Sequence, residues 1–385
     1  MAAPAAETLE CVALLERDRN EDLLTTWVYP AAEEGLRTAL EQWVTILAAG
    51  ALAARHQQRT DDDAEAAATD DQPPHPFIFT KYKTSWVYIQ GADGKEAGGG
   101  GGGGGTMVWV AVVVSSTGFN PERYEALLRA MVNAATGASG SGASPPKLLE
   151  CFLSVQIKGR YAPAGFVAAD HDPRKALLVS DIKHLVPALG VEFIVVWTAL
   201  LMKKRVAVYG AAVTDVLAAV RGLPALVWHR QDWSGRLLRP WVTLDPDSQL
   251  AELEQAGVFV AGFTDPGVRA LPDLYDVLVD LDQRTVRVMD HAAPDFKMGA
   301  FHKDLATYLL QAAADPDVSA QAIIKEVAVR TKELLTKLAA LRVEHEDGNK
   351  YITLEGLQAR KLPPNMDRFL YNVAGAENMT FNTHK

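Results

Sequence analysis

The chain has 385 residues, 48% of them apolar, and carries a formal net charge of −10 at pH 7. This length and apolar content can build a hydrophobic core in two domains or in one large two-lobed unit. The acidic balance disfavours a protein that coats nucleic-acid phosphates, and the most apolar run, residues 193–202, is shorter than the roughly 20 residues that a membrane-spanning helix needs. We therefore expect no nucleic-acid partner and only peripheral association with membranes.

The first half of the chain, residues 1–160, has the pattern of a small antiparallel sheet with helices on it. Two β-like runs flank a polar turn and predict a hairpin, and Leu36, Leu40 and Trp43 recur at helical spacing in the next segment. Pro121 is suited to the first turn of a second helix. The expected elements are strands at 10–16, 23–29, 77–82, 85–90 and 107–115 and helices at 32–48 and 122–132.

Three stretches of low complexity interrupt this lobe. Residues 48–74 are rich in alanine and aspartate, residues 91–105 end in eight consecutive glycines, and residues 134–146 consist largely of Gly, Ser and Ala. Such compositions cannot bury a core. We expect flexible loop insertions, with the glycine run at a hairpin tip, where an insertion costs little.

The second half, residues 161–385, alternates helices with short apolar strands, which indicates a partly parallel α/β sheet. A core of residues 175–290 precedes a mostly helical segment, residues 291–385. Asp181 can cap the first helix and Gly190 can end it, while the second helix is apolar almost all round and should be buried. The expected core elements are helices at 182–189, 192–203 and 213–221 and strands at 206–209, 225–228, 259–263 and 277–281.

A search for chemistry in these elements yields only weak candidates. The glycine run lacks both the Lys-Ser/Thr of a phosphate-binding loop and the glycine spacing of a dinucleotide fold. Asp276, Asp280 and Asp282 share one face of a strand, which fits a solvated strand face better than a metal site. The basic step at 203–205 either offsets a helix dipole or contacts acidic lipid or a partner carboxylate. We predict no catalytic residue, no metal and no cofactor.

The most promising binding segment is Trp-His-Arg-Gln-Asp-Trp at 228–233. His229 and Asp232 could serve as a base and its orienting carboxylate, but no nucleophile lies nearby in the sequence. A turn anchored by two tryptophans is one interpretation. The other is a surface that faces a protein partner, since Trp and Arg are common in binding hot spots. In that case Arg230, Asp232 and Trp233 are the candidate contact residues.

Four motifs of the second half occur together in the order of a known family. A leucine-rich helix leads through a basic step into a strand at 198–209, and a Leu-Pro segment with aromatics follows at 223–233. Val-Ala-Gly-Phe stands at 260–263, and an Asp-rich strand at 272–282. With this combination the chain resembles the DENN family. The resemblance implies a bilobed DENN fold, in which a longin-like α+β N-lobe with an antiparallel sheet precedes an α/β C-lobe with a helical tail.

The resemblance also implies a function, namely guanine nucleotide exchange on a Rab-family small GTPase in early-to-late endosome trafficking. A cytoplasmic protein, peripheral on late endosomes, is then expected. An exchange factor needs no acid, base or nucleophile, so we expect no hydrolase or transferase site, and we place the GTPase contact at Arg230, Asp232 and Trp233. An alternative stays open: a non-enzymatic DENN-fold adaptor subunit of an endosomal sorting assembly of the Commander type.

Overall fold

The computed structural model of the chain describes residues 8–17, 22–61, 75–93, 109–136, 144–230, 237–244, 249–345, 348–363 and 365–381. The chain divides into two compact units, Met1–Ala176 and Leu177–Lys385. Sequence analysis placed the domain boundary after residue 160. In the structure the first unit extends to Ala176 and includes the small elements between 160 and 176. Each unit has its own five-stranded sheet.

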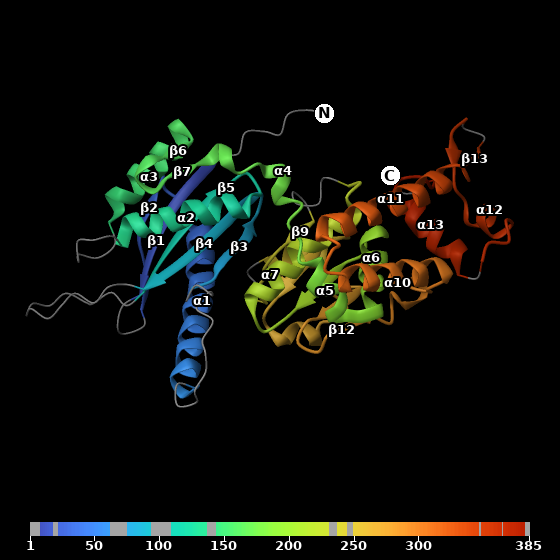
Figure 1. The fold of residues 1–385 in the computed structure, drawn as a ribbon, viewed down its shortest axis with the longest axis horizontal. Helices are drawn as coiled ribbons and strands as arrows, with labels where there is room; N and C mark the ends of the chain where they lie inside the picture. Colours follow the sequence, from blue (N-terminus) through green and yellow to red (C-terminus); the bar gives the residue numbers. More distant parts are fainter. Residues whose placement is uncertain are drawn as a thin grey trace, which may run out of the picture. The chain divides into compact units, whose positions relative to one another are not determined.

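The sheet of the first unit is antiparallel, with the strand order β2-β1-β5-β4-β3 (Figure 1). All eight residues of the central strand β5 are buried, which requires cover on both faces of the sheet. This is the predicted α+β arrangement. Its strands are β1 (Leu9–Arg17), β2 (Leu23–Tyr29), β3 (Phe77–Tyr82), β4 (Ser85–Asp93) and β5 (Trp109–Ser116).

Three helices pack on this sheet. Helix α1 (Glu34–Asp61) contacts β2 and β4, helix α2 (Pro121–Thr136) contacts β4 and β5, and helix α3 (Pro145–Lys158) contacts β1. Sequence patterns predicted the first two helices but missed α3. The remaining small elements are β6 (Arg160–Tyr161), η1 (Ala162–Ala164), β7 (Phe166–Val167), η2 (Ala168–Asp170) and α4 (Pro173–Ala176).

The prediction of a flexible insertion at 48–74 is wrong for its first part, because α1 continues to Asp61. Alanine has the highest helix propensity, so an alanine-rich extension of an existing helix adds turns without a new nucleation cost. Residues 62–74 lie outside the described residues, as do 94–105 and 137–143 of the other two low-complexity stretches. The described ends of those stretches belong to regular elements, 91–93 to β4, 134–136 to α2 and 145–146 to α3, so the prediction is wrong there too.

The sheet of the second unit is partly parallel, as predicted, with the strand order β12-β11-β8-β10-β9. Strand β8 lies between β10 and β11, and Val206 at its start pairs with Val260 and Val277. Strand β12 closes one edge in the antiparallel direction. The strands are β8 (Val206–Tyr209), β9 (Leu238–Arg239), β10 (Val260–Phe263), β11 (Val277–Asp280) and β12 (Thr285–Val288).

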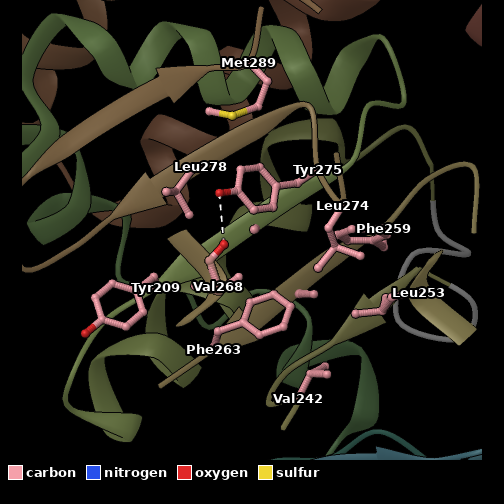
Figure 2. Packing of buried hydrophobic residues seen from close by; sticks show 12 residues of the cluster. Tyr209, Val242, Leu253, Phe259, Phe263, Val268, Leu274, Tyr275, Leu278 and Met289 are labelled. Atoms are coloured by element: carbon pink, nitrogen blue, oxygen red, sulfur yellow. Dashed lines mark hydrogen bonds between the residues drawn. The ribbon is translucent and has the colours of Figure 1, made fainter. Parts of the chain in front are cut away.

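One hydrophobic cluster shows how this sheet is held on one side (Figure 2). Phe259, Phe263 and Tyr275 are each at most 1% exposed, and burial of a side chain of this size stabilises the fold by roughly 1.5–3 kcal/mol. The Tyr275 hydroxyl donates a hydrogen bond of 3.2 Å to the carbonyl oxygen of Val268, which satisfies the polar end of a buried ring. The cluster thus fixes η5 (Pro266–Ala270) against β10 and β11.

Helices α6 (Phe193–Leu201) and α7 (Val213–Gly222) contact the strands of this sheet, and the helices from Ala300 onward form the predicted helical C-terminal part. Helix α6 is buried at eight of its nine positions, as its uniformly apolar sequence predicted. The helices are α5 (Ile182–Leu189), η3 (Gly190–Glu192), α6 (Phe193–Leu201), α7 (Val213–Gly222), η4 (Leu223–Val227), α9 (Gln249–Gln255), η6 (Ala293–Asp295), α10 (Ala300–Ala314), α11 (Ala320–Ala339), α12 (Leu354–Gln358) and α13 (Met366–Ala376). A short hairpin, β13 (Val343–Glu344) and β14 (Lys350–Tyr351), lies between α11 and α12.

The segment Ile182–Leu201 is long and apolar enough to cross a membrane by length and composition alone, but 61% of it is buried inside the protein. Gly190 divides it into α5 and α6 with a positive φ of 61°, a backbone conformation that glycine adopts at little cost. Both helices contact α10. They therefore form part of the core of the second unit.

Two local predictions for this unit are wrong. Residues 225–228 are not a strand, because η4 covers Leu223–Val227 and has Pro224 in its first turn. A short buried apolar run has no periodicity that separates a strand from a helical turn. Asp181 stands at the start of α5, but its carboxylate makes no capping hydrogen bond to the backbone and pairs with His184 instead.

Candidate protein-binding site

Arg230, the last described residue of the binding segment predicted at 228–233, is hydrogen-bonded to the C-terminal end of α6. That helix ends at Leu201, which leaves its last carbonyl groups without helical donors. The Arg230 guanidinium donates hydrogen bonds to the carbonyl oxygens of Leu200 at 2.7 Å and Leu201 at 2.6 Å. A cation is favourable at the negative end of a helix dipole, so Arg230 acts as a C-terminal cap for α6.

Glu377, directly after α13, also contacts Arg230, and we call Arg230 with its contacts to α6 and Glu377 the Arg230 anchor. Its Oε1 accepts a hydrogen bond from Arg230 Nε at 2.8 Å and lies 3.1 Å from His229 Nε2. Burial by itself raises the pKa of Glu377, but the hydrogen bond with His229 and the charge of Arg230 outweigh burial and lower it to about 2. The carboxylate is therefore ionised at neutral pH, and it balances a guanidinium whose side chain is only 6% exposed.

A groove of about 490 Å³ lies beside this anchor, and we call it the α11 groove. Trp228 and His229 line one side, where contacts between η4 and α11 hold the segment in place. Most of the lining is apolar, and the exposed Lys332 supplies a positive charge. The residues from α11 are Ala328, Lys332, Leu335, Thr336 and Ala339. An apolar recess with one cation suits an apolar side chain of a protein partner beside a carboxylate.

The structure separates the three contact residues that the sequence singled out. The Arg230 side chain is used inside the unit, by α6 and Glu377, and presents little surface to a partner. Asp232 and Trp233 lie outside the described residues, and their contact role stays a prediction. Sequence analysis missed Glu377, because 147 residues separate it from Arg230 and nothing local marks the pair.

Two of the three residues of the basic step at 203–205 form ion pairs within the unit. Lys204 Nζ lies 2.7 Å from Asp295 Oδ2, and Arg205 Nη2 lies 2.9 Å from Asp276 Oδ1. All four side chains are at most 24% exposed. The charges of Lys204 and Arg205 are therefore paired inside the unit, and not with acidic lipid or a partner carboxylate as one of the two predictions had it.

The prediction of a solvated face on the Asp-rich strand is confirmed for Asp282, which is exposed, and is wrong for Asp276 and Asp280. Asp276 is 8% and Asp280 is 1% exposed, since arginines neutralise both carboxylates. Arg269 Nη2 lies 2.8 Å from Asp280 Oδ2, and Asp282 Oδ1 accepts a hydrogen bond of 3.0 Å from the backbone N–H of Ala211. Buried charges such as those of Asp276 and Asp280 persist only when they are paired, so these two aspartates hold neighbouring segments to the sheet.

Comparison with known proteins places this geometry in a family. The profile described as "Stabilization of polarity axis" matches residues 180–290, which include α6, the sheet of the second unit and Arg230. Proteins called DENN domain-containing protein 10 match nearly the whole chain. The one from Dictyostelium discoideum is 34% identical, with 96% of this chain and 97% of the relative covered. The chain belongs to the DENN-domain family.

Two vertebrate relatives support the same assignment for this DENN-domain chain. The Danio rerio protein is 34% identical and the Homo sapiens protein 33% identical, and each alignment covers 98% of this chain and 99% of the relative. Both carry the name DENN domain-containing protein 10. The predicted family and the α/β fold class are therefore confirmed, and a DENN family role follows.

Proposed function

We propose that this DENN-domain chain is a guanine nucleotide exchange factor for a Rab-family GTPase. It acts in early-to-late endosome trafficking as a cytoplasmic protein, peripheral on late endosomes. The observation that carries the proposal is the similarity to DENN-domain relatives over 96–98% of the chain.

Nucleotide exchange makes and breaks no covalent bond, and the factor drives it with binding energy alone. The factor binds the nucleotide-free GTPase more tightly than the nucleotide-bound form, and linkage then weakens nucleotide binding by the same factor. A rate of GDP release raised about 10³-fold corresponds to a barrier lowered by roughly 4 kcal/mol. A few well-placed contacts can supply this amount, since single hot-spot residues contribute about 2 kcal/mol or more.

The α11 groove and the adjoining segment 228–233 are our candidate for these contacts. Trp228 offers an aromatic wall, and Lys332 offers a charge for a carboxylate of the GTPase. In this proposal Asp232 and Trp233 touch the partner, whereas Arg230 holds the segment in place through α6 and Glu377. Arg230 is then a positioning residue.

The test is release of a fluorescent GDP analogue from a panel of purified Rab GTPases, with catalytic amounts of the full chain. We expect acceleration for one or a few Rabs. Lys332→Glu and Asp232→Arg should lower the accelerated rate at least about tenfold, because each reverses a charge at the proposed contact. Lys337→Glu is the matched control, since Lys337 lies on the same helix and does not line the groove.

Two outcomes would contradict the proposal. If folded chain accelerates no member of the panel and co-purifies in stoichiometric amounts with a large endosomal assembly, the adaptor alternative is favoured. If exchange occurs but Lys332→Glu and Lys337→Glu behave alike, the function stands and the contact lies elsewhere on the chain.

A further inference from the structure

A second pocket, of about 460 Å³, lies within the first unit and has a different chemistry. We call it the α2–α3 pocket, because residues of those two helices and of the turn after β6 line it. Figure 1 labels the three elements. Among the nine described residues that line the pocket, four have polar side chains that can donate hydrogen bonds and none has a carboxylate. The four are Arg129, Asn133, Lys147 and Tyr161.

Tyr161 is the observation that points to a ligand. Its side chain lines the pocket although the residue is only 3% exposed. Its hydroxyl makes no hydrogen bond with any part of the chain that the structure describes. Burial raises the pKa of Tyr161, and the nearby Glu150 raises it further, so the hydroxyl keeps its proton at neutral pH and can donate. At the pocket wall this hydroxyl can donate to a ligand that enters.

The turn that places Tyr161 is built by the local sequence. Gly159 and Gly165 have positive φ values of 64° and 67°, and the N–H of Gly159 donates to the carbonyl oxygen of Val155 at 2.9 Å to end α3. Tyr161 pairs with Phe166 across the small β6–β7 ladder. The two glycines therefore let the chain reverse twice and bring the ring of Tyr161 to the pocket beside α2.

Two cations stand at the pocket and can be recruited by an anion. Arg129 pairs with Glu125, and Lys147 Nζ lies 2.9 Å from Glu150 Oε2, but neither glutamate lines the pocket. The Arg129 and Lys147 side chains are 62% and 56% exposed, so these ion pairs contribute little and can be exchanged. The charge of the lining itself is +2.

We propose that the α2–α3 pocket binds a phosphate monoester carried on a small polyol, either free in solution or as a lipid headgroup. A phosphate monoester has three terminal oxygens, which match Arg129, Lys147 and Tyr161, whereas a carboxylate has only two. The volume leaves room for the body of the ligand against Ala126, Ala130 and Pro163, in the usual range for small-molecule sites. Nothing in the proposed exchange function requires this pocket.

The test uses the full chain and two probes. Isothermal titration with inositol trisphosphate measures the soluble ligand, and co-sedimentation with phosphatidylcholine vesicles, with and without phosphatidylinositol phosphates, measures the lipid. Tyr161→Phe and Lys147→Ala should each weaken the probe that binds by at least about tenfold, as expected for a lost hydrogen bond to a charged group. Lys158→Ala is the matched control, since Lys158 is exposed on α3 and does not line the pocket.

Binding of the soluble probe with this variant pattern supports a free phosphate ester, and binding of the vesicles alone supports a lipid headgroup. The proposal is overturned if neither probe binds the wild-type chain. It is equally overturned if Lys147→Ala, which changes only an exposed side chain, binds as tightly as Lys158→Ala.

Discussion

Glu377→Gln probes the energy of the Arg230 anchor. The wild-type carboxyl has its pKa lowered from 4.5 to about 2, which corresponds to roughly 3 kcal/mol of stability at neutral pH. The amide of Gln keeps an acceptor for Arg230 but removes the charge that balances a nearly buried guanidinium. Since Arg230 retains the carbonyl oxygens of Leu200 and Leu201, we expect a loss near the lower end of the range for broken buried pairs, about 3 kcal/mol.

The pH dependence gives the sharper test. The folded pKa of Glu377 lies below the unfolded value, so its contribution is complete above about pH 4.5 and is lost as the pH falls towards 2. The difference in unfolding free energy between wild type and Glu377→Gln should therefore shrink to less than about half at pH 3. Urea unfolding followed by far-ultraviolet circular dichroism measures the two unfolding free energies at neutral pH and at pH 3.

Glu326→Gln is the control for this experiment. Glu326 also pairs with an arginine, Arg330, at 2.9 Å, but it is 41% exposed and four residues away on one helix. Such pairs stabilise by about 0.3–0.5 kcal/mol. If Glu377→Gln cost no more than this control, or if its cost did not change with pH, Arg230 and Glu377 would not form the anchor described above.

Three further predictions concern the rest of the chain. Gly262→Ala should cost more than about 3 kcal/mol of unfolding free energy, because its Cβ would lie 2.1 Å from the carbonyl oxygen of Pro240, whereas Gly257→Ala, with open space around it, should not lower stability. Burial lowers the pKa of His302 to about 4, below its value of 6.5 in the unfolded chain. The contribution of neutral His302 to the unfolding free energy is therefore complete above about pH 6.5 and falls by about 2 kcal/mol between pH 7 and pH 5. In urea unfolding, His302→Phe should show a smaller loss of stability over this pH range. Deletion of residues 98–105 should leave the melting temperature nearly unchanged, and a drop of many degrees in calorimetry would refute the linker prediction.

Local patterns predicted most of the secondary structure because hydrophobic periodicity reports which face of an element is buried. Leu40 and Trp43 recur at helical spacing, and both are at most 3% exposed in α1. The pattern failed where the same residues suit two conformations. The run 225–228 is equally apolar as a strand or as a 3₁₀ turn, and only its packing in the second unit selects η4.

The sequence predicted less of the candidate site than of the secondary structure, because the site is formed by residues far apart in the chain. The sequence marked Arg230 as a hot-spot residue because of its type and its aromatic neighbours. Its partners are the end of α6 and a glutamate 147 residues later, and neither has a local signal. The exposed part of the site comes instead from Trp228 and Lys332, which the fold of the second unit brings to one groove.

The sequence by itself determined the order of the elements in the first lobe and the parallel character of the second sheet, because these depend on short-range periodicity. It also pointed to the family, through the resemblance of four motifs in the second half. Tertiary structure decided which charges are satisfied within the chain and which remain for a partner. Asp276 and Arg230 have the residue types of functional sites, yet their charges are balanced inside the second unit. Lys332, Tyr161 and Lys147 have no distinguishing motif, and they line the two pockets. The physical reason is that desolvation and ion pairing depend on neighbours distant in sequence, which only the fold brings together.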